Sequence, residues 1–125
     1  MLLHLVAIAL GGAVGAISRF LLSTYVYALL GRDFPYGTLA ANVLGCLLMG
    51  FLSILLLERI AMSAEWRAAL LIGGLGAFTT FSTFSLETLS LLQSGEQLRA
   101  FLNIALSILL CLMATWFGMW CAKQL

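Results

Sequence analysis

The sequence IGGLGAFTTFSTFSLE, from Ile72 to Glu87, decides the fold. It lies in an apolar segment long enough to cross a bilayer, but it carries three glycines within four residues, followed by five hydroxyl side chains interleaved with phenylalanines. Each glycine costs a helix interior about 1 kcal/mol relative to alanine. In hydrocarbon, every backbone polar group needs a partner within the protein, so a weakened helix survives only where it faces protein or a watery cavity. We therefore predict a broken helix that lines an ion site.

The composition of the whole chain is typical of an integral membrane protein. Of its 125 residues, 63% are hydrophobic and 9% are charged, against roughly 25% charged in an average soluble domain. Residues 34–57, 68–86 and 100–122 contain no Asp, Glu, Lys or Arg, and Arg19 alone interrupts residues 2–30. Each run is close to the ~20 residues that a helix needs to span hydrocarbon, which predicts an all-α membrane protein with four transmembrane helices. The predicted spans of this single domain, residues 1–125, are about 2–30, 35–57, 66–94 and 97–121.

The charges that flank these spans give almost no preferred orientation across the membrane. With four spans, one side holds Arg59, Arg67 and Lys123, and the other side holds Arg32 and Arg99. Three basic residues against two give almost no positive-inside bias, so the chain is able to insert in both directions. Four helices of this size are also few to enclose a conduit alone. Both points favour an antiparallel, dual-topology homodimer.

Small and polar residues form stripes along three of the spans. Small residues at four-residue spacing let helices approach closely in lipid. On the first two spans these are Ala7, Gly11, Gly15, Gly37, Ala41 and Gly45. The fourth span has a narrow polar stripe of Asn103, Ser107, Cys111 and Thr115. The spacing of Cys46, Cys111 and Cys121 matches no metal motif, so we interpret the cysteines as small buried apolar side chains.

Two ionisable residues, Arg19 and Glu87, lie within the predicted spans. Such groups are costly in hydrocarbon and usually face a cavity or a partner, and Arg19 in a water-filled vestibule would concentrate anions. The plainer alternatives are that Arg19 extends to the membrane interface and that Glu87 ends the apolar part of the third helix. His4 has no paired carboxylate or cysteine nearby in the sequence, and no catalytic motif occurs, so we do not expect an enzyme.

The hydroxyl and phenyl side chains of the broken stretch suit a small anion. Ser and Thr supply hydrogen-bond donors without fixed charge, and phenyl rings are electropositive at their edges. Phe81 and Phe84 share a helix face, and Ser82 and Thr83 lie between them on adjacent faces. Unwound carbonyls around the glycines suit a cation, as in broken transporter helices. The alternative is that the phenylalanines are core residues and the hydroxyls bond back to backbone carbonyls.

These residues together resemble a known family. The run GGLGAFTTFSTFSLE, with Asn42 in TLAANVLGC and Arg19 in GGAVGAISRF, strongly resembles the Fluc family of fluoride channels, also called CrcB-like proteins. The resemblance covers essentially all four spans. It implies an antiparallel dimer with two fluoride pores and a central structural sodium ion. It also implies a multi-pass protein of the bacterial inner membrane that lets fluoride leave the cytoplasm passively.

The resemblance further implies roles for individual residues. Gly76 and Thr79 would hold sodium through their backbone carbonyls, Arg19 would lie in the vestibule, and Glu87 at the far end of the pathway. Cys111 stands where we would expect a hydroxyl, so this chain departs from the pattern at one end of the polar track. The fluoride pore residues implied by the resemblance are Asn42, Phe81, Phe84, Ser82, Thr83, Ser107 and Glu87.

Two other functions remain open at the level of the sequence. A small four-span multidrug exporter also works as an antiparallel dimer, but such exporters use a carboxylate inside the first helix, where this chain carries Arg19. The second alternative is a non-transporting membrane assembly subunit that is held together by the small-residue stripes. A fluoride flux assay in liposomes distinguishes all three functions.

Overall fold

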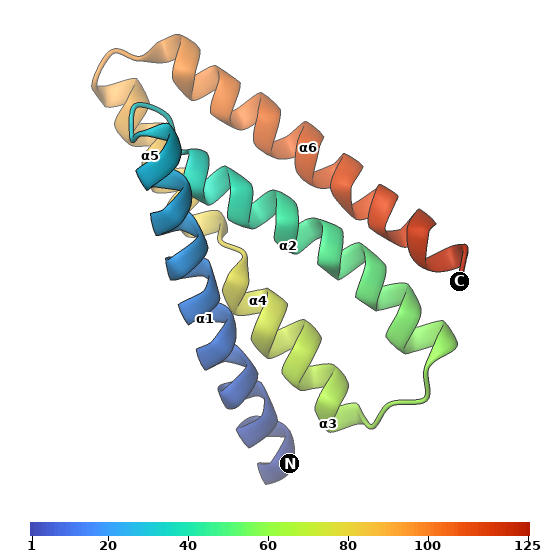
Figure 1. Ribbon diagram of the computed structural model, residues 1–125. Coiled ribbons are helices and arrows are strands. Elements are labelled where there is room, and N and C mark those ends of the chain that lie inside the picture. The colour runs from blue at the N-terminus through green and yellow to red at the C-terminus, as the bar shows by residue number, and fades with distance from the viewer.

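The computed structural model describes residues 1–125 and contains helices joined by short loops, with no strand (Figure 1). The predicted all-α architecture is confirmed, because four helical stretches are long and apolar enough to cross a membrane. These stretches are Leu2–Leu30, Tyr36–Arg59, Ala64–Gln93 and Gln97–Lys123.

Eight helical elements make up the four stretches, and two of them are π-helical. The elements are α1 (Leu2–Leu30), α2 (Tyr36–Ile54), the π-helical η1 (Leu55–Arg59), α3 (Ala64–Arg67), the π-helical η2 (Ala68–Leu75), α4 (Gly76–Phe78), α5 (Phe81–Gln93) and α6 (Gln97–Lys123). Local sequence signals set their ends. Gly31 terminates α1 with a φ of 86°, a backbone conformation that favours glycine. Ser63 caps α3 by accepting a hydrogen bond from the Trp66 N–H.

Two pairs of neighbouring helices organise the fold. α1 lies along η2 and α4, and α2 runs side by side with α6 in the same direction (Figure 1). Both contacts are close because glycines occupy the crossing points. A β-carbon on Gly15 would collide with the Gly74 carbonyl, and one on Gly50 would collide with the Thr115 carbonyl. The small-residue stripe of the first span therefore serves helix packing.

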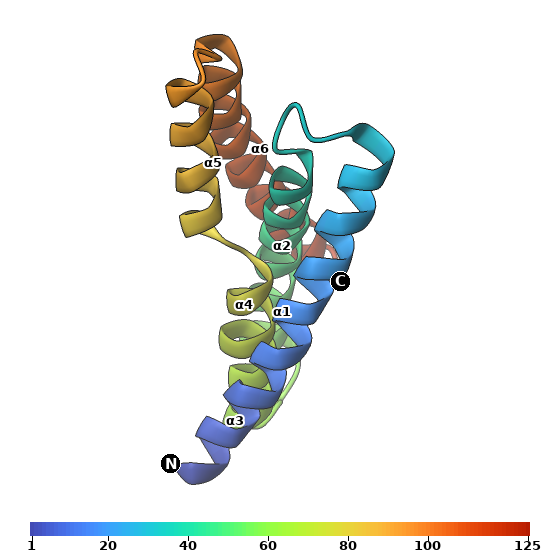
Figure 2. The ribbon, with the colours of Figure 1, turned by 90° about the vertical axis from the view of Figure 1, so that its left-hand side faces the viewer.

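The third stretch is interrupted at Thr79 and Thr80, whose backbone is extended (Figure 2). The interruption lies within the predicted broken stretch, Ile72–Glu87, but it comes after the glycines and not around them. The first two glycines lie within η2 and Gly76 begins α4, so the helix ends only after Phe78. The glycines instead allow close packing, since a β-carbon on Gly73 would collide with the Ile8 carbonyl of α1.

The core of the single chain is small. Only 20 of its 125 residues are buried, and large apolar side chains on all four stretches are exposed. Lipid tails and a second protein surface are the environments that suit such faces.

Candidate ion pathway

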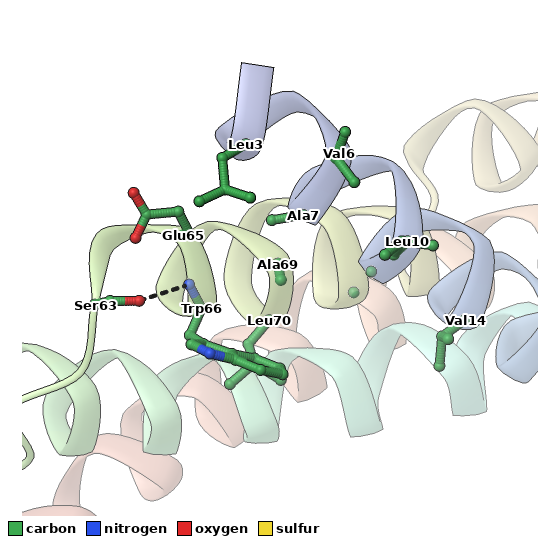
Figure 3. A pocket seen from close by; sticks show the side chains of 12 residues that line it. Leu3, Val6, Ala7, Leu10, Val14, Ser63, Glu65, Trp66, Ala69 and Leu70 are labelled. Atoms are coloured by element: carbon green, nitrogen blue, oxygen red, sulfur yellow. Dashed lines mark hydrogen bonds between the residues drawn. The ribbon is translucent and has the colours of Figure 1, made fainter. Parts of the chain in front are cut away.

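The largest cavity of the chain has few polar groups that could bind an ion. It measures about 560 Å³ and lies between α1 and the α3–η2 segment, where apolar side chains such as Leu10, Val14 and Trp66 line it (Figure 3). None of the predicted ion-site residues lines this cavity. The residues with ion chemistry lie instead around the interruption of the third stretch.

Asn42 on α2 holds the interrupted backbone. Its Nδ2 donates to the Thr80 carbonyl at 2.9 Å, and its Oδ1 accepts from the Thr80 N–H at 2.7 Å. One side-chain amide thus satisfies both backbone groups of Thr80, as an apolar surrounding requires. Nδ2 carries two hydrogens, and the second makes no hydrogen bond within the chain. Asn42 therefore stabilises the break and still has one donor to offer.

The interruption also leaves backbone carbonyls without donors. In an α-helix the carbonyl of residue i accepts from the N–H of residue i+4. The Gly76 carbonyl would accept from the Thr80 N–H, but that N–H donates to Asn42 Oδ1. The Thr79 carbonyl would accept from the Thr83 N–H, but that N–H donates to Thr80 Oγ1 at 3.2 Å. Neither carbonyl accepts any of the backbone hydrogen bonds that lie outside the helices. Both oxygens are free acceptors, and unwound carbonyls of this kind coordinate sodium in broken transporter helices.

A cavity of about 350 Å³ lies beside the break, bounded by α2, α5 and α6, and we call it the phenyl cavity. Phe81 and Phe84 line it, with ring centroids 5.3 Å apart and ring planes inclined by 43°. Asn42 and Ser107 line it as well, so the fold brings four of the predicted pore residues together. The Phe81 side chain is 78% exposed, which leaves this wall open in a single chain.

A second cavity, of about 240 Å³, is bounded by α1, α2 and α5, and we call it the vestibule. Arg19, Thr83 and Glu87 line it, and Glu87 also lines a cavity of about 360 Å³ beside Arg32 and Asp33. Thr80 lines both the vestibule and the phenyl cavity, which makes the two cavities neighbours. Ser82 lines neither of them, although its hydroxyl lies 3.3 Å from Thr80 Oγ1.

Glu87 has one satisfied and one unsatisfied carboxylate oxygen. Oε1 accepts from the Thr38 hydroxyl at 2.8 Å and from the Tyr27 hydroxyl at 3.3 Å. Oε2 is buried and accepts no hydrogen bond. A buried carboxylate oxygen without a donor is costly, so it marks a place that a proton, a donor or a cation would stabilise.

The sequence did not lead us to include Tyr27 and Thr38 among the site residues. A signal existed for Thr38, which lies four residues before Asn42 and therefore one turn away on α2. No pattern in the sequence indicated Tyr27. Its hydroxyl reaches Glu87 only because α1 crosses α2 near Gly37, where a β-carbon would collide with the Tyr27 ring.

A chain of hydrogen bonds joins α5 to α6 next to the phenyl cavity. The Thr88 hydroxyl donates to the Phe84 carbonyl at 2.7 Å, and Asn103 Nδ2 donates to the Thr88 hydroxyl at 2.9 Å. Ser107 then donates to Asn103 Oδ1 at 3.5 Å. All three polar side chains are buried, so the chain of bonds fixes the position of α5 against α6.

A comparison with protein families identifies the group to which this architecture belongs. The family model of the CrcB-like proteins, described as Camphor Resistance (CrcB), matches residues 6–119. The chain belongs to the CrcB family. The match includes all the residues that were predicted for the pore, the vestibule and the sodium site. The resemblance seen in the sequence is thus confirmed.

Curated relatives of this CrcB chain carry a common name, fluoride-specific ion channel FluC. The relative from Methylococcus capsulatus is 58% identical over 125 residues, or 100% of the chain, but the chain spans only 55% of that protein's length. The relative from Hydrogenovibrio crunogenus is 52% identical over 98% of the chain and 92% of its own length. The relative from Geobacter sulfurreducens is 53% identical over 97% of the chain and 98% of its own length. The name describes an ion channel and not an enzyme, in agreement with the prediction, and the four apolar helices make the CrcB chain a multi-pass membrane protein.

Proposed function

We propose that this chain is a fluoride-selective ion channel that lets fluoride leave the bacterial cytoplasm passively across the inner membrane. The observation that carries the proposal is the phenyl cavity, which is lined by Phe81, Phe84, Asn42 and Ser107 and by no charged side chain. A passive conduit must bind its ion well enough to replace water and weakly enough to release it. Neutral donors and ring edges meet that requirement. The shared name of the curated relatives supports the same function.

An antiparallel dimer would complete the pathway. Phe81 is 78% exposed in the single chain, so one wall of the phenyl cavity has no protein behind it. A second copy in the opposite orientation would cover this wall, and symmetry would then produce two equivalent pores. The near absence of charge bias between the two sides of the membrane is compatible with such dual insertion.

We further propose that a structural sodium ion occupies the centre of the dimer. The residues present fit such an ion, because the carbonyls of Gly76 and Thr79 accept no backbone hydrogen bond. Two chains would supply four oxygens of this kind. The ion would supply a positive charge that offsets the cost of leaving these carbonyls unpaired.

The residues between the vestibule and the phenyl cavity would carry fluoride from one to the other. Arg19 would raise the anion concentration in the vestibule. Thr80 lines both cavities, and its hydroxyl lies 3.0 Å from the Thr83 hydroxyl, so this pair would pass the anion toward Phe84. The free hydrogen of Asn42 Nδ2 would donate to fluoride inside the phenyl cavity.

The test is fluoride efflux from proteoliposomes, followed with a fluoride-selective electrode in sodium and, separately, in a large organic cation. We expect rapid passive efflux in sodium and a loss of activity after prolonged removal of sodium. A protein that moves a cationic drug against protons and leaves trapped fluoride inside would be an exporter. A protein that moves neither substrate would be an assembly subunit.

A further inference from the structure

Two cysteines stand at the same level of the neighbouring helices α2 and α6. These helices run side by side in the same direction, so equal steps along both keep residues at the same level (Figure 1). Their backbones meet where Gly50 lies against Thr115. One helical turn earlier on both helices stand Cys46 and Cys111. Both residues line the phenyl cavity.

The surroundings of this pair differ from those of an ordinary buried cysteine. Both side chains are only half-buried and border a cavity of about 350 Å³, so they are not fillers of a packed core. One further turn earlier on the same two helices are Asn42 and Ser107, the polar residues of the same cavity. Cys121 is also half-buried, but it does not line this cavity. None of the three cysteines is fully buried in the single chain, and only Cys46 and Cys111 border the phenyl cavity.

Two cysteine sulfur atoms that border the same cavity, at the same level of neighbouring helices, are suited to one class of metal ion. No group of three or more His, Cys, Asp or Glu side chains occurs in the chain, which excludes the four-ligand site of structural zinc. Thiolates select soft cations such as Cu(I), and soft d10 cations accept two sulfur ligands in a line. We propose that Cys46 and Cys111 form a two-sulfur site for such cations and that a bound cation closes the phenyl cavity to fluoride. The second half of this proposal rests on the proposed function.

The charge balance of the reaction suits an apolar surrounding. When Hg²⁺ binds, two S–H bonds break, two S–Hg bonds form, and two protons leave to water, so the product carries no net charge. When Ag⁺ or Cu⁺ binds, one thiol loses its proton and the other coordinates as a neutral thiol, which again leaves no net charge. No electron is transferred in either case. A neutral product avoids the large cost of a charge within the membrane.

The bound metal would block conduction for a steric and a chemical reason. It would join α2 to α6 in the wall of the phenyl cavity and narrow a cavity that is already small. Fluoride is a hard anion and a poor ligand for a soft cation. The metal would therefore not serve as an additional fluoride site along the path.

The probe is Hg²⁺, added as the nitrate to reduced protein, and the starting variant is Cys121→Ser, which retains only the proposed pair. We expect one mercury ion per chain, the loss of both titratable thiols, and block of fluoride efflux at near-stoichiometric mercury. Adding Cys46→Ser or Cys111→Ser to this variant removes one ligand and should raise the mercury concentration needed for half-block by at least about tenfold. Serine is close to cysteine in size, so both variants should fold.

Three outcomes would overturn the proposal or part of it. Equal mercury affinity in the paired and single-thiol variants would refute the two-sulfur site. One bound mercury per chain with unchanged efflux would refute closure of the cavity. Loss of both thiols before mercury is added, reversed by a reductant, would identify the pair as a disulfide instead. Mercury content and thiolate–mercury absorption are measured without transport, so a protein that binds mercury but moves no fluoride would contradict the proposed function alone.

Discussion

Replacing Asn42 with leucine tests the role of the amide that holds the broken helix. The substitution keeps the number and branching of the side-chain heavy atoms and removes the hydrogen bonds of 2.9 and 2.7 Å to the carbonyl and N–H of Thr80. Thr80 lies in extended backbone between α4 and α5, where no helix partner replaces them. An unsatisfied buried polar group costs about 1–3 kcal/mol. Thr80 is only half-buried, so the loss of both bonds should cost about 2 kcal/mol of folding free energy, the low end for two such groups.

The measurement is the unfolding midpoint of the purified protein in detergent, with hydrogen exchange of the peptide that contains Thr80. We expect Asn42→Leu to lower the midpoint by about 8 °C or more and to speed exchange at the break. Ser53→Ala on the same helix is the matched control, because the Ser53 hydroxyl bonds only to the Gly50 carbonyl of its own helix. If Asn42→Leu had the same unfolding midpoint and the same hydrogen-exchange rate at Thr80 as Ser53→Ala, the reasoning would be refuted, because Thr80 would then have another hydrogen-bond partner.

Three further predictions concern the cavities and the packing around the break. Phe81→Ile or Phe84→Ile should abolish fluoride efflux from liposomes while the dimer stays assembled on size-exclusion chromatography; unchanged efflux in both variants would remove the pore assignment. Gly45→Ala should cost about 1–3 kcal/mol in thermal unfolding, because its β-carbon would collide with the Thr79 methyl group, whereas an unchanged midpoint would mean that the break yields without cost. Arg19→Gln should slow efflux more at low than at high ionic strength, because salt screens the attraction of anions to the vestibule; a reduction independent of salt would contradict this role.

Much of the fold follows from the order of residues along the chain. The charge-free runs predict four spanning helices, because hydrocarbon tolerates few charges and a helix needs about 20 residues to cross it. The dense run of glycine, hydroxyl and phenyl side chains after Ile72 predicts an interrupted third helix. Both inferences depend on local composition and on hydrogen bonding within the segment. The structure bears them out for that reason.

The position of the interruption was not predictable in the same way. Because glycine weakens a helix, we expected the interruption at the glycines just after Ile72. In the fold the glycines pack against α1, and the chain unwinds at Thr79 and Thr80 instead. The decisive partner, Asn42, comes from another helix and is far away in the sequence. A backbone opens where a neighbour satisfies it, and only tertiary packing brings that neighbour.

The sequence by itself determined which residues have the chemistry for an anion path, and the tertiary structure decided which of them meet. Helical periodicity places Phe81 and Phe84 on one face without reference to any other helix. The contact of Glu87 with Tyr27 requires the rotation and register of separate helices, and so does the position of Cys46 and Cys111 beside one cavity. Those quantities are set by close packing at glycine contacts, a property of helix pairs that no single segment encodes.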